Sequence, residues 1–306
     1  MNILEEIIKK EEISTQPEIT SIENEEFHMI ALFIPPEDSF VNAEYFYKLI
    51  NGINRSAMAK GYNLLLRQQI LVPNVKLNNL PVDGFIVIAP ILNSPIVKEL
   101  EIMELPATLI NNRSLYLNWV DLDNVSAGKI AVEHLIKLGH KRIVFIGGVK
   151  NNQNTQDRLK GYQLALEKNK IKFEEDLVFY GDYETTEAYV ITKNLISENK
   201  DFSAIFCCND LMAIGAIYAL REKGIRVPED ISIVGFDDIG ITESFDPPIT
   251  TVRQPFSQIG ELAVQILVDQ IEGKLQEPKQ VELQGELVIR KSSGKFIKRK
   301  IWKNKI

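Results

Sequence analysis

Short apolar stretches rich in β-branched residues alternate along most of this chain with stretches in which apolar residues recur at helical spacing. Each apolar stretch is bounded by a turn signal. Such stretches are typical of strands in a sheet that helices cover on both faces. They predict strands at residues 29–34, 62–66, 84–89, 107–110, 142–147, 177–180, 203–208, 231–236 and 286–290.

The segments between these strands have the pattern of amphipathic helices. Apolar residues share one helical face over residues 46–57, 127–138 and 259–267, and Gly61 and Gly139 follow the first two. Strand, helix and strand at this spacing indicate βαβ units, which build parallel sheets. Two doubly wound sheets accommodate this many strands more comfortably than one. The sequence therefore predicts an α/β fold with two Rossmann-like, parallel-sheet subdomains.

A single late helix, predicted at residues 256–271, indicates how the chain divides between these subdomains. Because this helix follows the strands of the second sheet, we expect the chain to return to the first subdomain and then leave it again. The chain then crosses between the subdomains three times. The predicted ranges are 28–123 plus 256–280 for the first subdomain and 124–255 plus 281–293 for the second.

The two ends of the chain differ in charge. Residues 1–27 are strongly acidic and are predicted to be a linker segment, in which Ile3, Leu4, Ile7 and Ile8 could form one short helix. Residues 294–306 are basic. A solvated tail is the expected structure of such a terminus.

Composition narrows the class of protein. The 306 residues are 45% hydrophobic and 25% charged, the balance of a globular protein with a real core. The formal net charge of -7 makes this body a poor binder of nucleic acid by itself. The only cysteines, Cys207 and Cys208, are adjacent and are predicted to be buried, reduced thiols.

Localisation is predicted from what the sequence does not contain. The first ten residues lack a basic start followed by an apolar stretch, so no signal peptide is predicted. No window approaches the ~18 apolar residues that span a bilayer. We therefore expect a cytoplasmic protein without a membrane partner.

Motifs for catalysis and for cofactors are missing from the sequence. It contains no P-loop, no G-x-G-x-x-G opening a helix and no G-x-S-x-G elbow. His28, His134 and His140 are not clustered with other ligands at metal-binding spacing. The sequence therefore predicts a protein that is not an enzyme, with no metal and no cofactor.

Polar residues that directly follow predicted strands are the candidates for binding. Ligands of open parallel sheets bind outside the carboxyl ends of the strands. Carboxylates and amides there can hydrogen-bond to hydroxyl groups, and Tyr45 and Tyr183 could cover the apolar face of a sugar. The strand-end residues are Asn111 and Asn112, Asn209 and Asp210, and Asp237 and Asp238.

Several of these candidates, and Arg158 as a further one, also have a purely structural interpretation. Asn209 precedes a predicted helix and could simply cap it. One of Asp237 and Asp238 could make a turn while the other faces the cleft. Arg158 lies in a predicted helix, where an arginine is usually solvated.

The stretch from Asp123 to Arg290 closely resembles the effector-binding core of the lac repressor (LacI/GalR) family of transcriptional regulators. A less distinctive similarity extends it to residues 28–293, through Gly61-Tyr62 and Val82-Asp83-Gly84-Phe85. The motifs that carry the resemblance are His134-Leu135-Ile136-Lys137-Leu138-Gly139-His140, Arg158-Leu159-Lys160-Gly161-Tyr162, Cys208-Asn209-Asp210-Leu211-Met212-Ala213, Val227-Pro228-Glu229-Asp230, Gly235-Phe236-Asp237-Asp238 and Pro248-Ile249-Thr250-Thr251-Val252-Arg253-Gln254-Pro255.

This resemblance implies a periplasmic-binding-protein-like fold that binds a ligand between its subdomains, and a core that forms homodimers. Members of the family sense small molecules, so the expected partner is a mono- or disaccharide effector. The family's sugar-contacting positions fall on Arg158, Asn209, Asp237 and Gln254. Positions where the family places further cleft residues fall on Tyr183, Asn111 and Tyr45.

The chain departs from the family at its start. Members begin with a helix-turn-helix and a hinge helix. Here fewer than thirty residues precede the first predicted strand, and this short segment is acidic. As given, the chain is not expected to read an operator, and DNA would be contacted only through a helix-turn-helix that it lacks. A truncated regulator, a shortened gene product and a sensor paralogue without a DNA-binding domain that acts through partners all fit.

Two further classes of protein are weighed against the sensing core of a regulator. A solute-binding protein of a sugar transporter shares the fold, but the chain shows no signal peptide. A sugar-active enzyme on a similar sheet would need a catalytic constellation that the sequence does not show.

Overall fold

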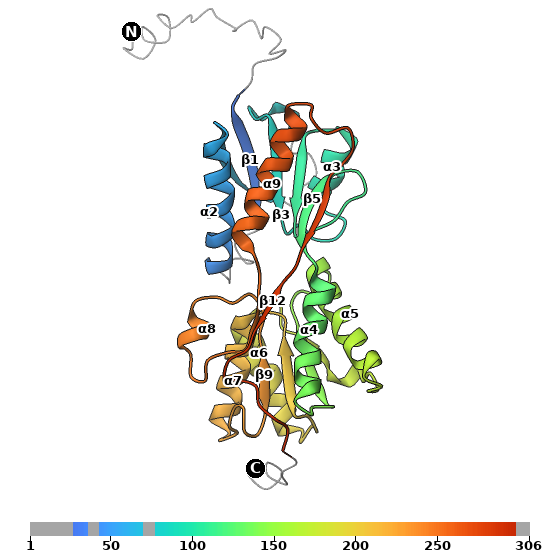
Figure 1. The fold of residues 1–306 in the computed structure, drawn as a ribbon, viewed down its shortest axis with the longest axis vertical. Helices are drawn as coiled ribbons and strands as arrows, with labels where there is room; N and C mark the ends of the chain where they lie inside the picture. Colours follow the sequence, from blue (N-terminus) through green and yellow to red (C-terminus); the bar gives the residue numbers. More distant parts are fainter. Residues whose placement is uncertain (1–26, 36–42, 70–76, 298–306) are drawn as a thin grey trace, which may run out of the picture.

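A computed structural model describes residues 27–35, 43–69 and 77–297. These residues form two α/β subdomains that follow one another along the long axis of the molecule (Figure 1). The predicted fold class, two subdomains with parallel sheets, is confirmed. The acidic segment at residues 1–26 and the last nine residues of the basic tail lie outside the described residues.

The first subdomain is built on a six-stranded sheet in which every pair of neighbouring strands is parallel. Helices α2 (Ala43–Ala59) and α9 (Phe256–Ile271) cover one face, and α3 (Pro95–Ile102) covers the other. In order across the sheet, the strands are β11 (Gln280–Leu283), β5 (Asn118–Leu122), β4 (Ala107–Ile110), β3 (Gly84–Ile88), β1 (Met29–Ile34) and β2 (Asn63–Gln68).

Strand β1 shows why this sheet is buried on both faces. Ile30 and Leu32 point into the core under α2 and α9, whereas Ala31 and Phe33 point into the core under α3. Side chains alternate between the faces of a strand, so a strand covered on both sides must be apolar at consecutive positions. The continuous apolar run at 29–34 meets this requirement.

The second subdomain has a four-stranded parallel sheet. An antiparallel pair of short strands, β10 (Thr251–Arg253) and β12 (Glu286–Val288), lies beside it. The main strands, in order, are β7 (Val178–Tyr180), β6 (Ile143–Gly147), β8 (Ala204–Cys207) and β9 (Ser232–Val234). The helices are α4 (Asn124–Lys137), α5 (Gln153–Lys168), α6 (Thr185–Ser197), α7 (Asp210–Glu222) and α8 (Ile241–Ser244).

Helices α4 and α5 approach each other closely because a glycine lies at their contact. A Cβ atom built at Gly161 would stand 2.3 Å from the carbonyl oxygen of Val125. Any other residue at this position would therefore push the two helices apart. The contact holds the start of α5, where Arg158 lies, in a defined place.

Three segments connect the subdomains: β5 leads into α4, β10 leads into α9, and β11 leads into β12 (Figure 1). The sequence placed residues 281–293 in the second subdomain. Strand β11 instead pairs with β5, so residues 281–283 extend the first sheet. Beyond this, the residue ranges of the two subdomains stay a proposal.

Three strands were not predicted from the sequence. Strand β5 is buried throughout, yet Asn118 and Asp121 interrupt its apolar pattern. Asn118 is satisfied by distant partners, because its amide donates to Gln270 Oε1 at 2.6 Å and its oxygen accepts from the Lys279 N–H at 2.8 Å. Strand β11 is a half-exposed edge strand, and β10 has three residues.

Candidate functional site

Arg158 is buried at the boundary between the subdomains, with 3% of its surface exposed. Its Nε donates to Asn124 Oδ1 at 2.9 Å and its Nη1 donates to the Cys208 carbonyl at 2.5 Å. The guanidinium carbon lies 3.7 Å from the centre of the Phe236 ring. These contacts hold the planar group of donors in one orientation. The solvated side chain that a helical arginine usually has is not what the structure shows.

Tyr183 and Asn209 are held together by the backbone of the second subdomain. Tyr183 has a positive φ of 66° and its hydroxyl lies 2.8 Å from Thr155 Oγ1. Asn209 Nδ2 donates to the Tyr183 carbonyl at 3.0 Å, while its Oδ1 accepts from the Met212 N–H at 2.8 Å. Asn209 therefore caps helix α7, the structural alternative raised for this residue. A contact of Asn209 with a ligand stays a prediction.

Asp237 and Gln254 form a buried pair. They are 5% and 6% exposed, and Gln254 Nε2 donates to Asp237 Oδ1 at 2.6 Å. An ionised carboxylate only accepts hydrogen bonds, which fixes the orientation of the Gln254 amide. Gln254 Oε1 is thereby left buried without a hydrogen-bond partner among the described residues. Such an acceptor is ready for a donor supplied by a ligand.

Tyr45 and Asn111 come from the first subdomain and bind each other. Asn111 follows β4, has a positive φ of 58° and is 3% exposed. Its Nδ2 donates to the Tyr45 hydroxyl. The Tyr45 ring meets the edges of Phe46 and Phe256, with 4.9 Å between ring centres in each case. The aromatic ring and the amide thus form one surface.

Helix α2 of the first subdomain contacts the second subdomain, because Glu44 accepts from the Gly240 N–H at 2.7 Å and Lys48 Nζ donates to the Asp238 carbonyl at 3.4 Å. Burial raises the pKa of the Tyr45 phenol above its ordinary range, and the negative charge of Asp237 raises it further. Burial also raises the pKa of Tyr183 to about 12, against the opposing positive charge of Arg158.

A hollow of about 250 Å³ opens next to the Asp237–Gln254 pair. It is lined by residues of both subdomains, among them Lys48 from α2 and Phe256 from α9. Of the seven predicted site residues, Asp237 and Gln254 line this hollow, whereas Tyr45, Asn111, Arg158, Tyr183 and Asn209 do not. Contact of any of the seven with a ligand stays a prediction.

Other polar residues at strand ends have structural partners. The Asn112 amide donates to a backbone carbonyl at 2.8 Å. Asp210 accepts from the Ile239 N–H at 3.0 Å, and burial raises the pKa of Asp210 well above its usual range. Asp238 forms an ion pair with Arg290 at 2.7 Å. Of the two adjacent aspartates, Asp237 is the one coupled to Tyr45 and Tyr183.

Sequence reasoning missed an ion cluster beside these residues. Arg113 lies within 3.4 Å of Asp121, 3.0 Å of Asp157 and 3.1 Å of Glu282. The sequence does show that Arg113 and Asp157 are near predicted site residues, because Arg113 lies two residues after Asn111 and Asp157 directly precedes Arg158. Nothing in the sequence shows that these residues meet.

The described part of the chain has neither a metal-binding cluster nor a membrane-spanning helix. Across residues 27–35, 43–69 and 77–297, no group of three or more His, Cys, Asp or Glu side chains could hold a metal ion. Cys207 and Cys208 are free thiols and fully buried. None of the described helices has the length and apolar character needed to cross a membrane.

The chain matches a known domain family and is similar to known transcriptional regulators. Residues 132–293 match the periplasmic binding protein-like domain family. The HTH-type transcriptional repressor PurR of Haemophilus influenzae (strain KW20 / Rd) is 32% identical over 267 residues, which cover 82% of this chain and 78% of that protein. The HTH-type transcriptional regulator CelR of Thermobifida fusca is 30% identical over 274 residues, which cover 86% of this chain and 80% of that protein.

Solved structures are similar over nearly the same length. The complex of the transcriptional regulator CelR with cellobiose has a TM-score of 0.81 at 28% identity and covers 88% of this chain and 86% of that chain. A LacI family transcriptional regulator from Enterococcus faecium with bound ribose has a TM-score of 0.76 at 25% identity. The similarity covers 88% of this chain and 100% of that chain.

Proposed function

The chain belongs to the LacI family of transcriptional regulators, and we propose that it senses a small polyhydroxyl effector held between its two subdomains. The observation that carries this proposal is the buried Asp237–Gln254 pair beside a hollow that Lys48 and Phe256 of the first subdomain also line. Together they offer hydrogen-bond donors, acceptors and an aromatic face, the set of groups that a neutral sugar requires.

A mono- or disaccharide is the class of effector that we propose. The structure of CelR contains cellobiose and that of the Enterococcus faecium regulator contains ribose, and this chain shares their fold. The buried Gln254 Oε1 needs a donor, and a hydroxyl group can supply it. Leaving a buried polar group unpaired costs about 1–3 kcal/mol, so a ligand rich in hydroxyls is favoured over an apolar one.

Closure on this effector would control DNA binding by the regulator. The relatives are named HTH-type regulators, and we place this protein with DNA in the cytoplasm. We propose binding rather than catalysis as its activity. A solute-binding protein of a transporter shares the fold, but both relatives that establish the family are regulators of transcription.

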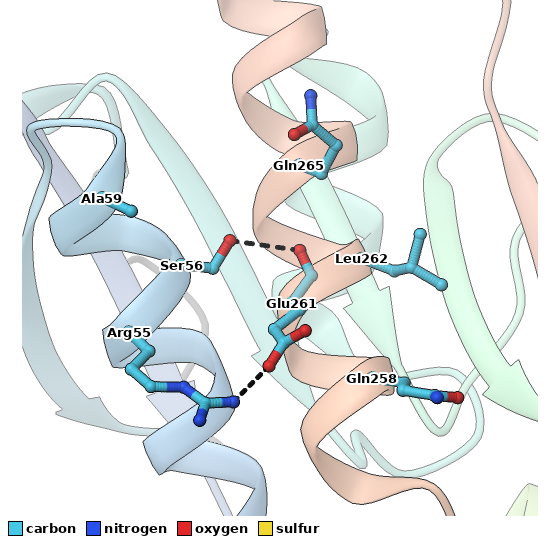
Figure 2. A pocket seen from close by; sticks show the side chains of 7 residues that line it. All are labelled: Arg55, Ser56, Ala59, Gln258, Glu261, Leu262 and Gln265. Carbon is cyan, nitrogen blue, oxygen red and sulfur yellow. Dashed lines mark hydrogen bonds and ion pairs between the residues drawn. The ribbon is translucent and has the colours of Figure 1, made fainter.

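We also propose that the chain forms a homodimer through the outer surface of α2 and α9. Figure 2 shows this surface, where Arg55 of α2 forms an ion pair with Glu261 of α9 and Ser56 donates to the Glu261 carbonyl at 3.3 Å. A hollow of about 690 Å³ lies between the helices, and the small side chain of Ala59 lines it. Sedimentation of the wild type and of Ala59→Arg tests this, with a shift to monomer expected in the variant.

A thermal-shift screen tests the proposed effector class. Cellobiose and ribose are the first probes, followed by a panel of neutral mono- and disaccharides, with adenine and uracil as planar heterocycles without sugar hydroxyls. A bound ligand at one hundred times its Kd stabilises the native state by about 2.7 kcal/mol. Stabilisation by a heterocycle and by none of the sugars would overturn the sugar assignment.

A further inference from the structure

Arg113 joins the two subdomains through ion pairs. It lies between β4 and β5 of the first sheet, and its Nη2 is 3.0 Å from Asp157 Oδ2 in helix α5 of the second subdomain. The Asp157 side chain is 10% exposed and that of Arg113 is 29% exposed. An ion pair so far removed from solvent is screened less by salt than one on the surface.

The other partners of Arg113 belong to its own subdomain. Arg113 Nη2 lies 3.1 Å from Glu282 Oε1 in β11, and its Nε lies 3.4 Å from Asp121 Oδ2 in β5. The guanidinium carbon is 5.4 Å from the centre of the Trp119 ring. Arg113 is thus held in place from its own side, and Asp157 is its one carboxylate partner across the boundary among the described residues.

This cluster is connected to the candidate effector site by short links. Arg113 follows Asn111 by two residues, and Asp157 directly precedes Arg158. Asp121 Oδ1 accepts from Asn124 Nδ2 at 3.1 Å, and Asn124 Oδ1 accepts from Arg158 Nε at 2.9 Å. Asn111 and Arg113 therefore lie on one side of the boundary, and Arg158 and Asp157 lie together on the other.

We propose that Arg113 and Asp157 are positioning residues whose ion pair fastens the closed arrangement of the subdomains, without touching the effector. This inference rests on the proposed function, because it assumes that closure accompanies effector binding. The ion pair forms only when the site residues of the two subdomains face each other. Its free energy therefore adds to the closed state and raises the affinity for any effector that needs closure.

The chain offers a matched control for this latch. Asp157→Asn and Glu282→Gln each remove one carboxylate that lies about 3 Å from the same Arg113 atom. Asp157 belongs to the opposite subdomain, whereas Glu282 belongs to that of Arg113. A role in closure predicts an effect of Asp157→Asn alone, whereas a merely structural ion cluster predicts similar effects of both changes on stability and none on closure.

Distances between spin labels on the two subdomains measure closure directly in the whole chain without ligand. Cysteines replacing Ile102 of α3 (82% exposed) and Val190 of α6 (46% exposed) carry the labels. Native Cys207 and Cys208 are buried, and burial raises the pKa of Cys208 to about 12, so both resist labelling. Dilution with unlabelled chain removes distances between copies.

The expected result is a redistribution of the label distances in Asp157→Asn, with the closed-to-open ratio falling about fivefold, the upper end of the range for a partly exposed ion pair. Glu282→Gln should change this ratio by less than about twofold, as for an exposed ion pair. Identical distributions in all three proteins, or equal shifts in both variants, would overturn the latch. A redistribution confined to Asp157→Asn supports the latch even if no sugar binds, so the two proposals can fail separately.

Discussion

The two subdomains contribute to the candidate site in different ways. In the second subdomain, Arg158 and Asn209 are each tied to backbone groups of that subdomain, through the Cys208 carbonyl and the Met212 N–H. In the first, Tyr45 and Asn111 bind each other across the gap between helix α2 and the end of strand β4. One side is fixed before a ligand arrives, and the other is assembled from two separate elements.

This difference has an energetic consequence. Side chains already held by hydrogen bonds lose little conformational freedom when a ligand binds, so their contacts contribute more of their strength to affinity. We therefore expect an effector to engage the second subdomain first, with Tyr45 and Asn111 closing over it. Substitutions on the two sides should then divide differently between affinity and stability.

The largest effect on affinity is expected at Asp237. Asp237→Asn keeps the shape of the side chain at a residue whose φ is 112°. The change removes the charge that accepts from ligand hydroxyls, and charged hydrogen bonds contribute about 1.5–3 kcal/mol. Affinity for the sugar found in the screen should fall about ten- to a hundredfold by calorimetric titration.

Asp238→Asn is the control, because it makes the same change at the next residue, also at a positive φ of 59°. Asp238 is engaged by Arg253 and Arg290, so its loss should lower the melting temperature and leave affinity nearly unchanged. If Asp238→Asn weakens binding as much as Asp237→Asn does, the second side of the site is assigned wrongly.

The positions of these residues show how far sequence reasoning reaches. Asn111 and Asp237 could be predicted because each ends an apolar strand of a parallel sheet, and ligands bind at that edge. Arg158 could be placed only through resemblance, since its partners, the Cys208 carbonyl and the Phe236 ring, come from other elements. The Arg113–Asp157 pair was missed because nothing in one sequence reports a contact across a subdomain boundary.

The fold shows the same division. Strands such as β1 were predicted because burial on both faces demands consecutive apolar residues. Strand β5 was missed because Asn118 and Asp121 are buried in it. Asn118 donates to Gln270, which is distant in the sequence, and Asp121 accepts from the Leu122 N–H and forms an ion pair with Arg113. Polar residues inside a strand look like a loop until those partners are known.

The buried carboxylate of Asp121 predicts a dependence of stability on pH. Burial raises its pKa from 3.8 to about 7, against the opposing charges of Arg113 and Arg158 and with the nearby charge of Asp157. Because the pKa is raised in the folded state, the folded protein binds this proton more tightly than the unfolded chain does. Protonated Asp121 therefore stabilises the fold at low pH, and this contribution is lost as the pH rises towards 7. The free energy of unfolding should thus fall by about 2 kcal/mol from pH 5 to pH 8.

Asp121→Asn should remove this part of the pH dependence while keeping an oxygen for the Leu122 and Asn124 donors. Asp210 also has a raised pKa and titrates in both proteins, so the difference between their denaturation curves isolates Asp121. Parallel curves from pH 5 to pH 8 would mean that Asp121 stays ionised in its pair with Arg113.

A smaller effect, on stability, is expected at Asn209. Asn209→Ala removes the cap of helix α7, which should cost about 1 kcal/mol and lower the melting temperature by about 2–4 °C. Asn209→Ser keeps a capping oxygen and should restore most of this loss. If Asn209 also contacts the effector, both variants will bind more weakly, whereas a cap alone leaves their affinities close to that of the wild type.

The smallest effect separates the two sides most directly. Tyr45→Phe removes the hydroxyl that binds Asn111 across two elements of the first subdomain, and Tyr183→Phe removes one bound to Thr155 within the second. In the open form water can satisfy Asn111, so Tyr45→Phe should leave the free energy of unfolding within about 0.5 kcal/mol and weaken binding about two- to fivefold. Tyr183→Phe leaves Thr155 without this partner whether or not a ligand is bound, so it should lower stability more than affinity. Equal stability losses in the two variants would mean that Tyr45 and Asn111 are as firmly held as the opposite side, and that the effector meets two preformed surfaces.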